Sequence, residues 1–154
     1  MSDQDYAPPG FASAVCYRDP AAALTWLETA FGFEQTMVIM TPDGQVAHSE
    51  MRYRAGRVMI GGEWSDDHKS PASLGGKNTQ TVHTQLDEDL DAHCERARAA
   101  GAEILAEPED QFYGDRTYRA RDPEGHIWTF SRTVKVMTRE EWDKAGGFVT
   151  KDRL

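Results

Sequence analysis

Residues 119–131 read RARDPEGHIWTFS, and this stretch decides the fold. Pro and Gly in the DPEGH segment are turn residues, and the residues on both sides have the composition of strands. We therefore predict a hairpin between strands at 113–121 and 126–132. Because side chains alternate along a strand, Thr129 should face the opposite way from Trp128 and Phe130. We expect those two aromatic side chains to pack in the core.

The same plan recurs earlier in the chain at a constant offset of 69 residues. A glycine that ends a helix, an arginine within a strand and a hairpin glycine all have counterparts at this distance (Gly32 and Gly101, Arg52 and Arg121, Gly56 and Gly125). One such match could arise by chance, but three together indicate a duplicated unit.

Each half also contains one amphipathic helix. Asp19 caps the first, which stops at Gly32, and Asp87 is expected to open the second, which stops at Gly101. We place His93 on the exposed side of this second helix. The tail sequence TREEWDKAG (138–146) predicts a further short, capped helix.

The order of elements is then βαβββ, twice. We interpret residues 1–154 as one domain, with a first unit at 10–64, a linker at 65–78, a second unit at 79–133 and a C-terminal tail at 134–154. A chain of 154 residues is large enough for one such domain with a real core.

Charge and composition exclude several classes of protein. The net charge of −9 argues against a nucleic-acid or anionic-membrane surface. The N-terminal sequence has no apolar signal segment, and no apolar run is long enough to span a bilayer. Cys16 and Cys94 form no CxxC pair, so we expect reduced thiols and a cytoplasmic location.

The helix end AFGFE (30–34) and the hairpin RARDPEGHIWTFS resemble the vicinal oxygen chelate superfamily, especially its glyoxalase and bleomycin-resistance branch. The resemblance covers residues 10–133 and implies an α+β fold, in which two tandem βαβββ units form curved mixed sheets around a cleft. In metal-dependent members, His, Glu or Gln side chains from the first and last strands of each unit hold a divalent cation. His126, in the DPEGH turn, resembles a structural histidine of such proteins, with a catalytic role as the alternative.

Carried onto this chain, those metal positions fall on Ala12, Ile60, Thr81 and Thr129. Transition metals are held by imidazole, carboxylate or thiolate, so this set predicts no metal and no cofactor. A rearranged site built from His83, His48 and Glu50 is the alternative.

The remaining cleft positions are small or apolar, as in many ligand sites. The candidate ligand-binding residues are Cys16, Val58, Trp64, His83, Phe112, Tyr113 and Thr129, with Ala14, Gly62, Ile127 and Ser131 on the same strand faces. A cleft simply filled by side chains is the competing interpretation.

The resemblance implies a metal-independent protein that binds an aromatic or hydrophobic compound or an antibiotic, acting as a homodimer with ligand sites near the subunit interface. Two enzyme hypotheses remain open. One is a metal-dependent glyoxalase, lyase or dioxygenase with rearranged ligands. The other is a metal-free enzyme in which His83 or a loop tyrosine moves a proton.

Overall fold

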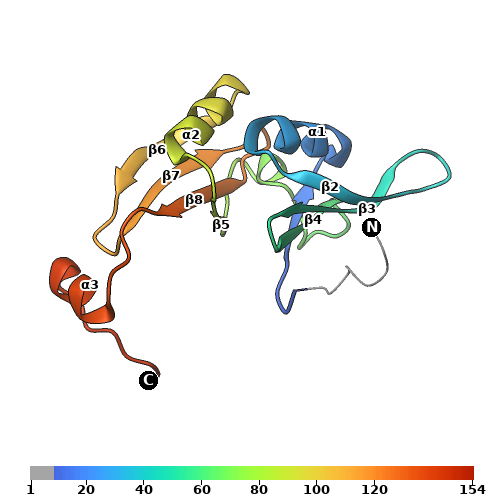
Figure 1. The fold of residues 1–154 in the computed structure, drawn as a ribbon. Helices are drawn as coiled ribbons and strands as arrows, with labels where there is room; N and C mark the ends of the chain where they lie inside the picture. The colour runs from blue at the N-terminus through green and yellow to red at the C-terminus, as the bar shows by residue number, and fades with distance from the viewer. Residues whose placement is uncertain (1–8) are drawn as a thin grey trace.

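The order of the elements along the chain is βαβββ, repeated, with a short helix after the second unit (Figure 1). The structure is a computed structural model that describes residues 9–154. The first unit comprises β1 (Ser13–Tyr17), α1 (Pro20–Phe31), β2 (Glu34–Met40), β3 (Val46–Tyr53) and β4 (Gly56–Gly62). The second comprises β5 (Thr81–Gln85), α2 (Leu90–Ala99), β6 (Glu103–Asp110), β7 (Asp115–Arg121) and β8 (Ile127–Thr133). A 3₁₀ turn, η2 (Pro71–Ser73), lies between the units, and α3 (Arg139–Gly146) follows them.

The two sheets have the same topology, which confirms the predicted pair of tandem units. Their strand orders are β1-β4-β3-β2 and β5-β8-β7-β6. In each, the first strand runs parallel to the last, and the other neighbours are antiparallel. The helices α1 and α2 lie on the same side of the sheets (Figure 1). The face beneath them is called the helix face below, and the opposite face the open face.

One aromatic-rich core joins the two units under these helices. Phe31 at the end of α1 packs against Phe130, with ring centroids 4.7 Å apart, and against Trp128 at 5.6 Å. Both β8 rings are fully buried, as the alternation in the hairpin predicts. Large aromatic side chains bury enough apolar surface to dominate the stability of such a core.

The helix ends agree with the sequence prediction at three of four positions. Asp19 accepts a hydrogen bond from Ala22 N, and Gly32 ends α1 with a left-handed φ of 72°. Gly101 also has a positive φ, at the end of α2. The prediction that Asp87 opens the second helix is wrong, because Asp89 supplies the cap by accepting from Ala92 N. Asp87 instead accepts a hydrogen bond from the Tyr53 hydroxyl, at 2.8 Å.

The placement of His93 on an exposed helix side is also wrong. Its side chain is buried, and its two ring nitrogens lie 2.6 Å from the Tyr118 hydroxyl and 2.9 Å from the Phe31 carbonyl oxygen. Burial lowers the pKa of this imidazole, because a charged ring would lose its hydration. His93 therefore connects α2 to β7 and to the end of α1 through buried polar contacts.

The DPEGH turn fastens the second unit to the first. The Asp122 carboxylate accepts from the Tyr17 hydroxyl at 2.6 Å and from Trp128 Nε1 at 3.0 Å. The Glu124 carboxylate accepts from the backbone N–H of Arg18 at 2.7 Å. His126 Nε2 lies 2.6 Å from the carbonyl oxygen of Cys16. These contacts favour the structural role of His126 over the catalytic one.

The tail forms the short helix that its sequence predicts. Thr138 and Glu141 make a reciprocal capping box at the start of α3, and Gly147 ends the helix with a φ of 72°. The helix lies on the side of the sheets away from α1 and α2 (Figure 1). Within residues 9–154, no helix has the length and apolar character required to cross a bilayer. The interpretation of the N-terminal sequence concerns mainly residues 1–8, which lie outside the described residues.

Candidate functional site

Strand pairing determines which side chains lie on the open faces. In the first sheet, Ala14 pairs with Met59 and Cys16 with Gly61. In the second, Thr81, His83 and Gln85 pair with Ile127, Thr129 and Ser131 respectively. The intervening residues of these strands belong to the helix face, where Val15, Ile60, Trp128 and Phe130 are buried in the core.

The assignment of Ile60 and Val58 to the cleft face is therefore wrong, and hairpin length is the reason. The pairs Glu34–Arg52 and Glu103–Arg121 keep the offset of 69 residues up to the last hairpin of each unit. Across that hairpin, Arg52 pairs with Arg57 whereas Arg121 pairs with Ile127, so the offset becomes 70. The first hairpin is one residue shorter, and a one-residue slip exchanges the two faces of the following strand.

Met59 is thus the counterpart of Thr129, and the four family metal positions correspond to Ala12, Met59, Thr81 and Thr129. The hydroxyl oxygens of Thr81 and Thr129 lie 2.7 Å apart and hydrogen-bond to each other. Hydroxyls, a methyl and a thioether do not fit a zinc, nickel, iron or manganese ion. Within residues 9–154, no three His, Cys, Asp or Glu side chains are grouped so that they could hold a metal.

The rearranged metal site is likewise not assembled. His48 and Glu50 are neighbours on β3, with His48 Nε2 at 3.4 Å from Glu50 Oε1. His83 belongs to the second sheet, where its Nε2 lies 2.9 Å from Ser131 Oγ. Within residues 9–154, His83 is not grouped with His48 and Glu50 so that the three could share one metal ion.

The open face of the first sheet contains a hollow of about 440 Å³. Cys16 and Trp64, two of the predicted binding residues, both line this open-face hollow. The other lining residues are Ala14, Val15, Val46, Ala47, His48, Met59, Gly61, Gly62 and Glu63. Trp64 is exposed at the rim and stacks on His68, with ring centroids 3.8 Å apart.

Two titratable groups in this hollow have shifted pKa values. Burial, with the nearby Glu63 carboxylate, raises the pKa of the Cys16 thiol, so the neutral thiol is favoured. Hydrogen bonds from the Ser73 side chain and the Ser70 backbone N–H lower the pKa of the Glu63 carboxyl. The hollow therefore presents a neutral sulfur beside a carboxylate that is ionised at neutral pH.

The open face of the second sheet is a network of hydroxyl, amide and imidazole groups. Ser131 donates to Gln85 Oε1 at 2.7 Å, and its oxygen also meets His83. Arg119 Nε donates to the Thr129 hydroxyl at 3.4 Å. His83, Gln85 and Arg119 are exposed, so this face can donate and accept hydrogen bonds from a bound molecule.

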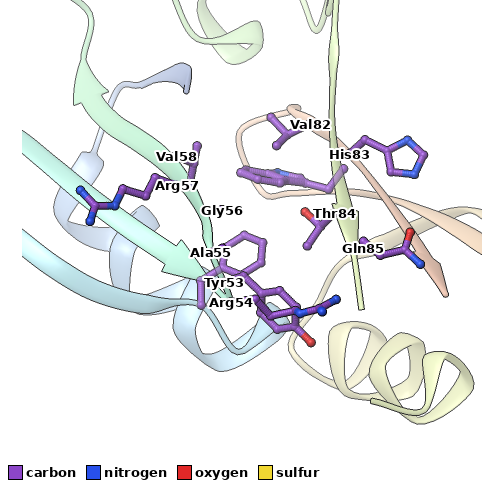
Figure 2. A pocket seen from close by; sticks show the side chains of 12 residues that line it. Tyr53, Arg54, Ala55, Gly56, Arg57, Val58, Val82, His83, Thr84 and Gln85 are labelled. Atoms are coloured by element: carbon purple, nitrogen blue, oxygen red, sulfur yellow. The ribbon is translucent and has the colours of Figure 1, made fainter. Parts of the chain in front are cut away.

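A second cavity, the inter-unit crevice, lies between the start of β4 and β5 (Figure 2). Its volume is about 300 Å³, and its lining residues are Phe33, Tyr53, Arg54, Ala55, Gly56, Arg57, Val58, Val82, His83, Thr84, Gln85 and Trp128. Val58 and His83 were predicted from the sequence to bind ligand, but their side chains lie on different faces of their sheets. Sequence patterns missed Phe33, Tyr53 and Trp128, because only the contact between the units brings them together.

Phe112 and Tyr113 lie at the turn between β6 and β7. Phe112 contacts Phe148 of the tail, with ring centroids 5.3 Å apart, and Tyr113 packs edge-on against Phe112 at 5.2 Å. Neither ring is among the described residues that line the open-face hollow or the inter-unit crevice.

Comparison with known proteins places this geometry in context. The family model described as the Glyoxalase/Bleomycin resistance protein/Dioxygenase superfamily matches residues 12–130. The chain is 30% identical over 137 residues to the uncharacterised protein Rv0887c of Mycobacterium tuberculosis (strain ATCC 25618 / H37Rv), covering 86% of this chain and 79% of the relative. It is 30% identical over the same length to the uncharacterised protein Mb0911c of Mycobacterium bovis, covering 86% and 89%.

Two solved structures extend the comparison. TioX from Micromonospora sp. ML1 is 32% identical, with a TM-score of 0.66 over 82% of this chain and 99% of that chain. TnmS3, described as an antibiotic binding protein from Streptomyces sp. CB03234, is 15% identical, with a TM-score of 0.61 over 79% and 93%. The likeness to TnmS3 concerns the fold alone.

Proposed function

The chain belongs to the Glyoxalase/Bleomycin resistance protein/Dioxygenase superfamily, and from this we propose that it binds an aromatic or hydrophobic small molecule, such as an antibiotic, without a metal ion. The observation that carries the proposal is the chemistry of the open faces. The positions that hold a metal in metal-dependent relatives are occupied by Ala12, Met59, Thr81 and Thr129, while a hollow with largely apolar walls lies beside Met59.

The open-face hollow supplies the apolar contacts in this proposal. Met59, Ala14 and Cys16 offer methyl, thioether and thiol surface, and the exposed Trp64 ring can stack on a flat ligand. A volume of about 440 Å³ falls within the range of small-molecule sites. TnmS3, which shares this fold, is an antibiotic binding protein.

We further propose that a second copy of the chain closes the site. Ala14 on the first sheet and Thr81, His83 and Gln85 on the second are exposed on the open faces. If the open face of one copy opposes that of another, the apolar hollow meets the hydroxyl and amide network. Such a homodimer in the cytoplasm would enclose a ligand between apolar and hydrogen-bonding walls.

Binding to a panel of aromatic compounds and antibiotics tests the function, measured by thermal shift and then by calorimetry. A compound that binds only the folded protein raises the unfolding temperature. We expect at least one of these compounds to bind. Its affinity should fall at least 10-fold in Gly61→Leu, because a side chain at this position would project into the open-face hollow. A Cβ at Gly61 meets no atom within 4 Å, so this variant should fold. Asp67→Ala, in the exposed linker, is the matched control and should bind as the parent does.

The metal hypothesis is tested on the same protein. We expect ligand affinity to be unchanged by EDTA and by added nickel, zinc, manganese or ferrous ions. Binding that requires one of these ions, or glyoxalase or dioxygenase turnover that appears with it, would refute the proposal. Light scattering during gel filtration tests the dimer separately, and a monomer at 100 µM, a concentration chosen for the assay, would refute that part.

A further inference from the structure

The inter-unit crevice is separate from the proposed open-face site. Strands β1 and β4 are parallel and their pairing begins at Ser13 and Val58, so the first residues of β4, Gly56 and Arg57, extend beyond the start of β1. The crevice occupies this region, between the start of β4 and β5. Val58 and Met59 therefore contribute to different cavities, one on each face of the first sheet.

The walls of the crevice are apolar and held in place by the core. Trp128, Phe33 and Val58 are buried, with 0%, 4% and 6% of their surface exposed. Phe33 contacts Trp128, with ring centroids 5.5 Å apart, and Tyr53 at 6.0 Å. Rings that are already packed lose little freedom when a flat molecule binds against them.

The Thr84 hydroxyl lies among these apolar walls. Figure 2 shows Val82 and Thr84 directed from β5 toward β4, whereas His83 and Gln85 point the other way. Within the described residues 9–154, the half-buried Thr84 hydroxyl makes no hydrogen bond. A hydroxyl without a protein partner is free to pair with a polar group of a molecule bound in the crevice.

The entrance carries both signs of charge, and its charged groups contact one another or the Tyr53 hydroxyl. The Tyr53 hydroxyl donates to the carboxylates of Asp87, at 2.8 Å, or Glu88, at 3.1 Å, and Arg54 Nε lies 3.6 Å from Asp87. Desolvation and these carboxylates raise the pKa of the Tyr53 phenol, which stays neutral. The two carboxylates beside one guanidinium disfavour an anionic ligand, and the apolar walls disfavour the burial of any ionised group, so a neutral molecule fits best.

We propose that the inter-unit crevice is a second binding site, which takes a neutral aromatic molecule of one or two fused rings bearing a single hydroxyl group. Its rings lie against Trp128, Phe33 and Val58, and its hydroxyl pairs with Thr84. The volume of about 300 Å³ limits the ligand to this size. Because the walls come from both units, the bound molecule bridges them.

Calorimetric titration of the full chain with 2-naphthol tests the site. We expect saturable binding of one molecule per chain in Gly61→Leu, in which the open-face hollow is filled and only the crevice is open. Thr84→Val keeps the shape but removes the hydroxyl, and should weaken binding about 5- to 10-fold, the ratio for one neutral hydrogen bond. Val82→Phe should abolish binding by filling the crevice.

Gly61→Leu is the matched control, because it fills only the open-face hollow: the naphthol binding that remains in this variant is the binding in the crevice, and its affinity should equal that of the crevice in the parent chain. No saturable binding by the parent chain, or binding that Gly61→Leu abolishes and Val82→Phe does not, overturns the proposal. If Val82→Phe does not fold, as judged by circular dichroism, Thr84→Val decides alone, and unchanged affinity in that variant refutes the assigned contact. The proposed open-face function is tested separately, because its measurement is the effect of Gly61→Leu on the binding of the compound panel.

Discussion

Replacing Asp122 with alanine removes the acceptor on which the two units converge. Its carboxylate accepts from Tyr17 Oη at 2.6 Å, from Trp128 Nε1 at 3.0 Å and from the backbone N–H groups of Glu124 and His126, each at 3.0 Å. In the alanine variant, the Tyr17 hydroxyl and the Trp128 indole N–H lose this partner. Both residues are buried, with 2% and 0% of their surface exposed.

The expected loss follows from these two donors. Each buried donor without a partner costs about 1–3 kcal/mol, so Asp122→Ala should lower the free energy of unfolding by about 4 kcal/mol. Asn at this position still accepts through Oδ1 but opposes Trp128 Nε1 with an N–H, and should cost about 2 kcal/mol. Tyr17→Phe removes only one donor and should cost about 1 kcal/mol. Marginal stability makes all three losses measurable.

Urea denaturation followed by tryptophan fluorescence gives these free energies by linear extrapolation. Asp67→Ala is the control, because this exposed linker carboxylate should change stability by no more than about 0.5 kcal/mol. The double variant of Tyr17→Phe and Asp122→Ala should cost less than the sum of the single changes, since the two share a contact. A loss below about 1 kcal/mol in Asp122→Ala, with an unchanged m-value, would refute the assigned role of the turn.

Two further predictions concern pH and backbone conformation. Since burial lowers the pKa of His93 in the folded state, the unfolded chain binds a proton first as the pH falls below about 6.5. The free energy of unfolding should therefore decrease as the pH falls below this value, by at most about 1.4 kcal/mol per pH unit from this group. His93→Gln should reduce this dependence of the unfolding free energy on pH, measured by urea titration at several pH values. An equal dependence in both proteins would contradict the burial of His93 as its cause. Gly125 has a φ of 99°, and a Cβ there would lie 2.8 Å from Pro71 Cβ, so Gly125→Ala should lower the unfolding free energy by about 2 kcal/mol. Gly61→Ala, with open space around it, should change that free energy by less than about 1 kcal/mol, and equal losses in both variants would exclude the conformational cause.

Local signals were sufficient to predict the topology. Helix-ending glycines and strand alternation act over a few residues. The offset of 69 residues repeats these local signals in the second half, and the pairs Glu34–Arg52 and Glu103–Arg121 preserve it. The shorter first hairpin gave no comparable signal. Arg54 adopts a left-handed φ of 54° there, a conformation usually marked by Gly or Asn, so composition did not reveal the turn length.

Contacts between the two units lay beyond the reach of sequence patterns. His93 looked solvent-facing on its own helix, but the Phe31 carbonyl of the other unit supplies a buried partner. The inter-unit crevice depends in the same way on Phe33 and Trp128, which are 95 positions apart in the sequence. The open faces were more predictable, since Thr81, His83 and Thr129 follow directly from strand alternation.

The shorter first hairpin shows how the two repeated units of such a protein can acquire different ligand-facing surfaces. Removing one residue from a turn presents the other half of a strand's side chains to solvent, without changing a single amino acid in the strand itself. The two halves of this chain now display unlike chemistry, thioether and thiol on one and hydroxyls on the other. After gene duplication, an insertion or deletion in a loop is thus a route to new ligand preference that point substitution in the strands would reach only through many steps.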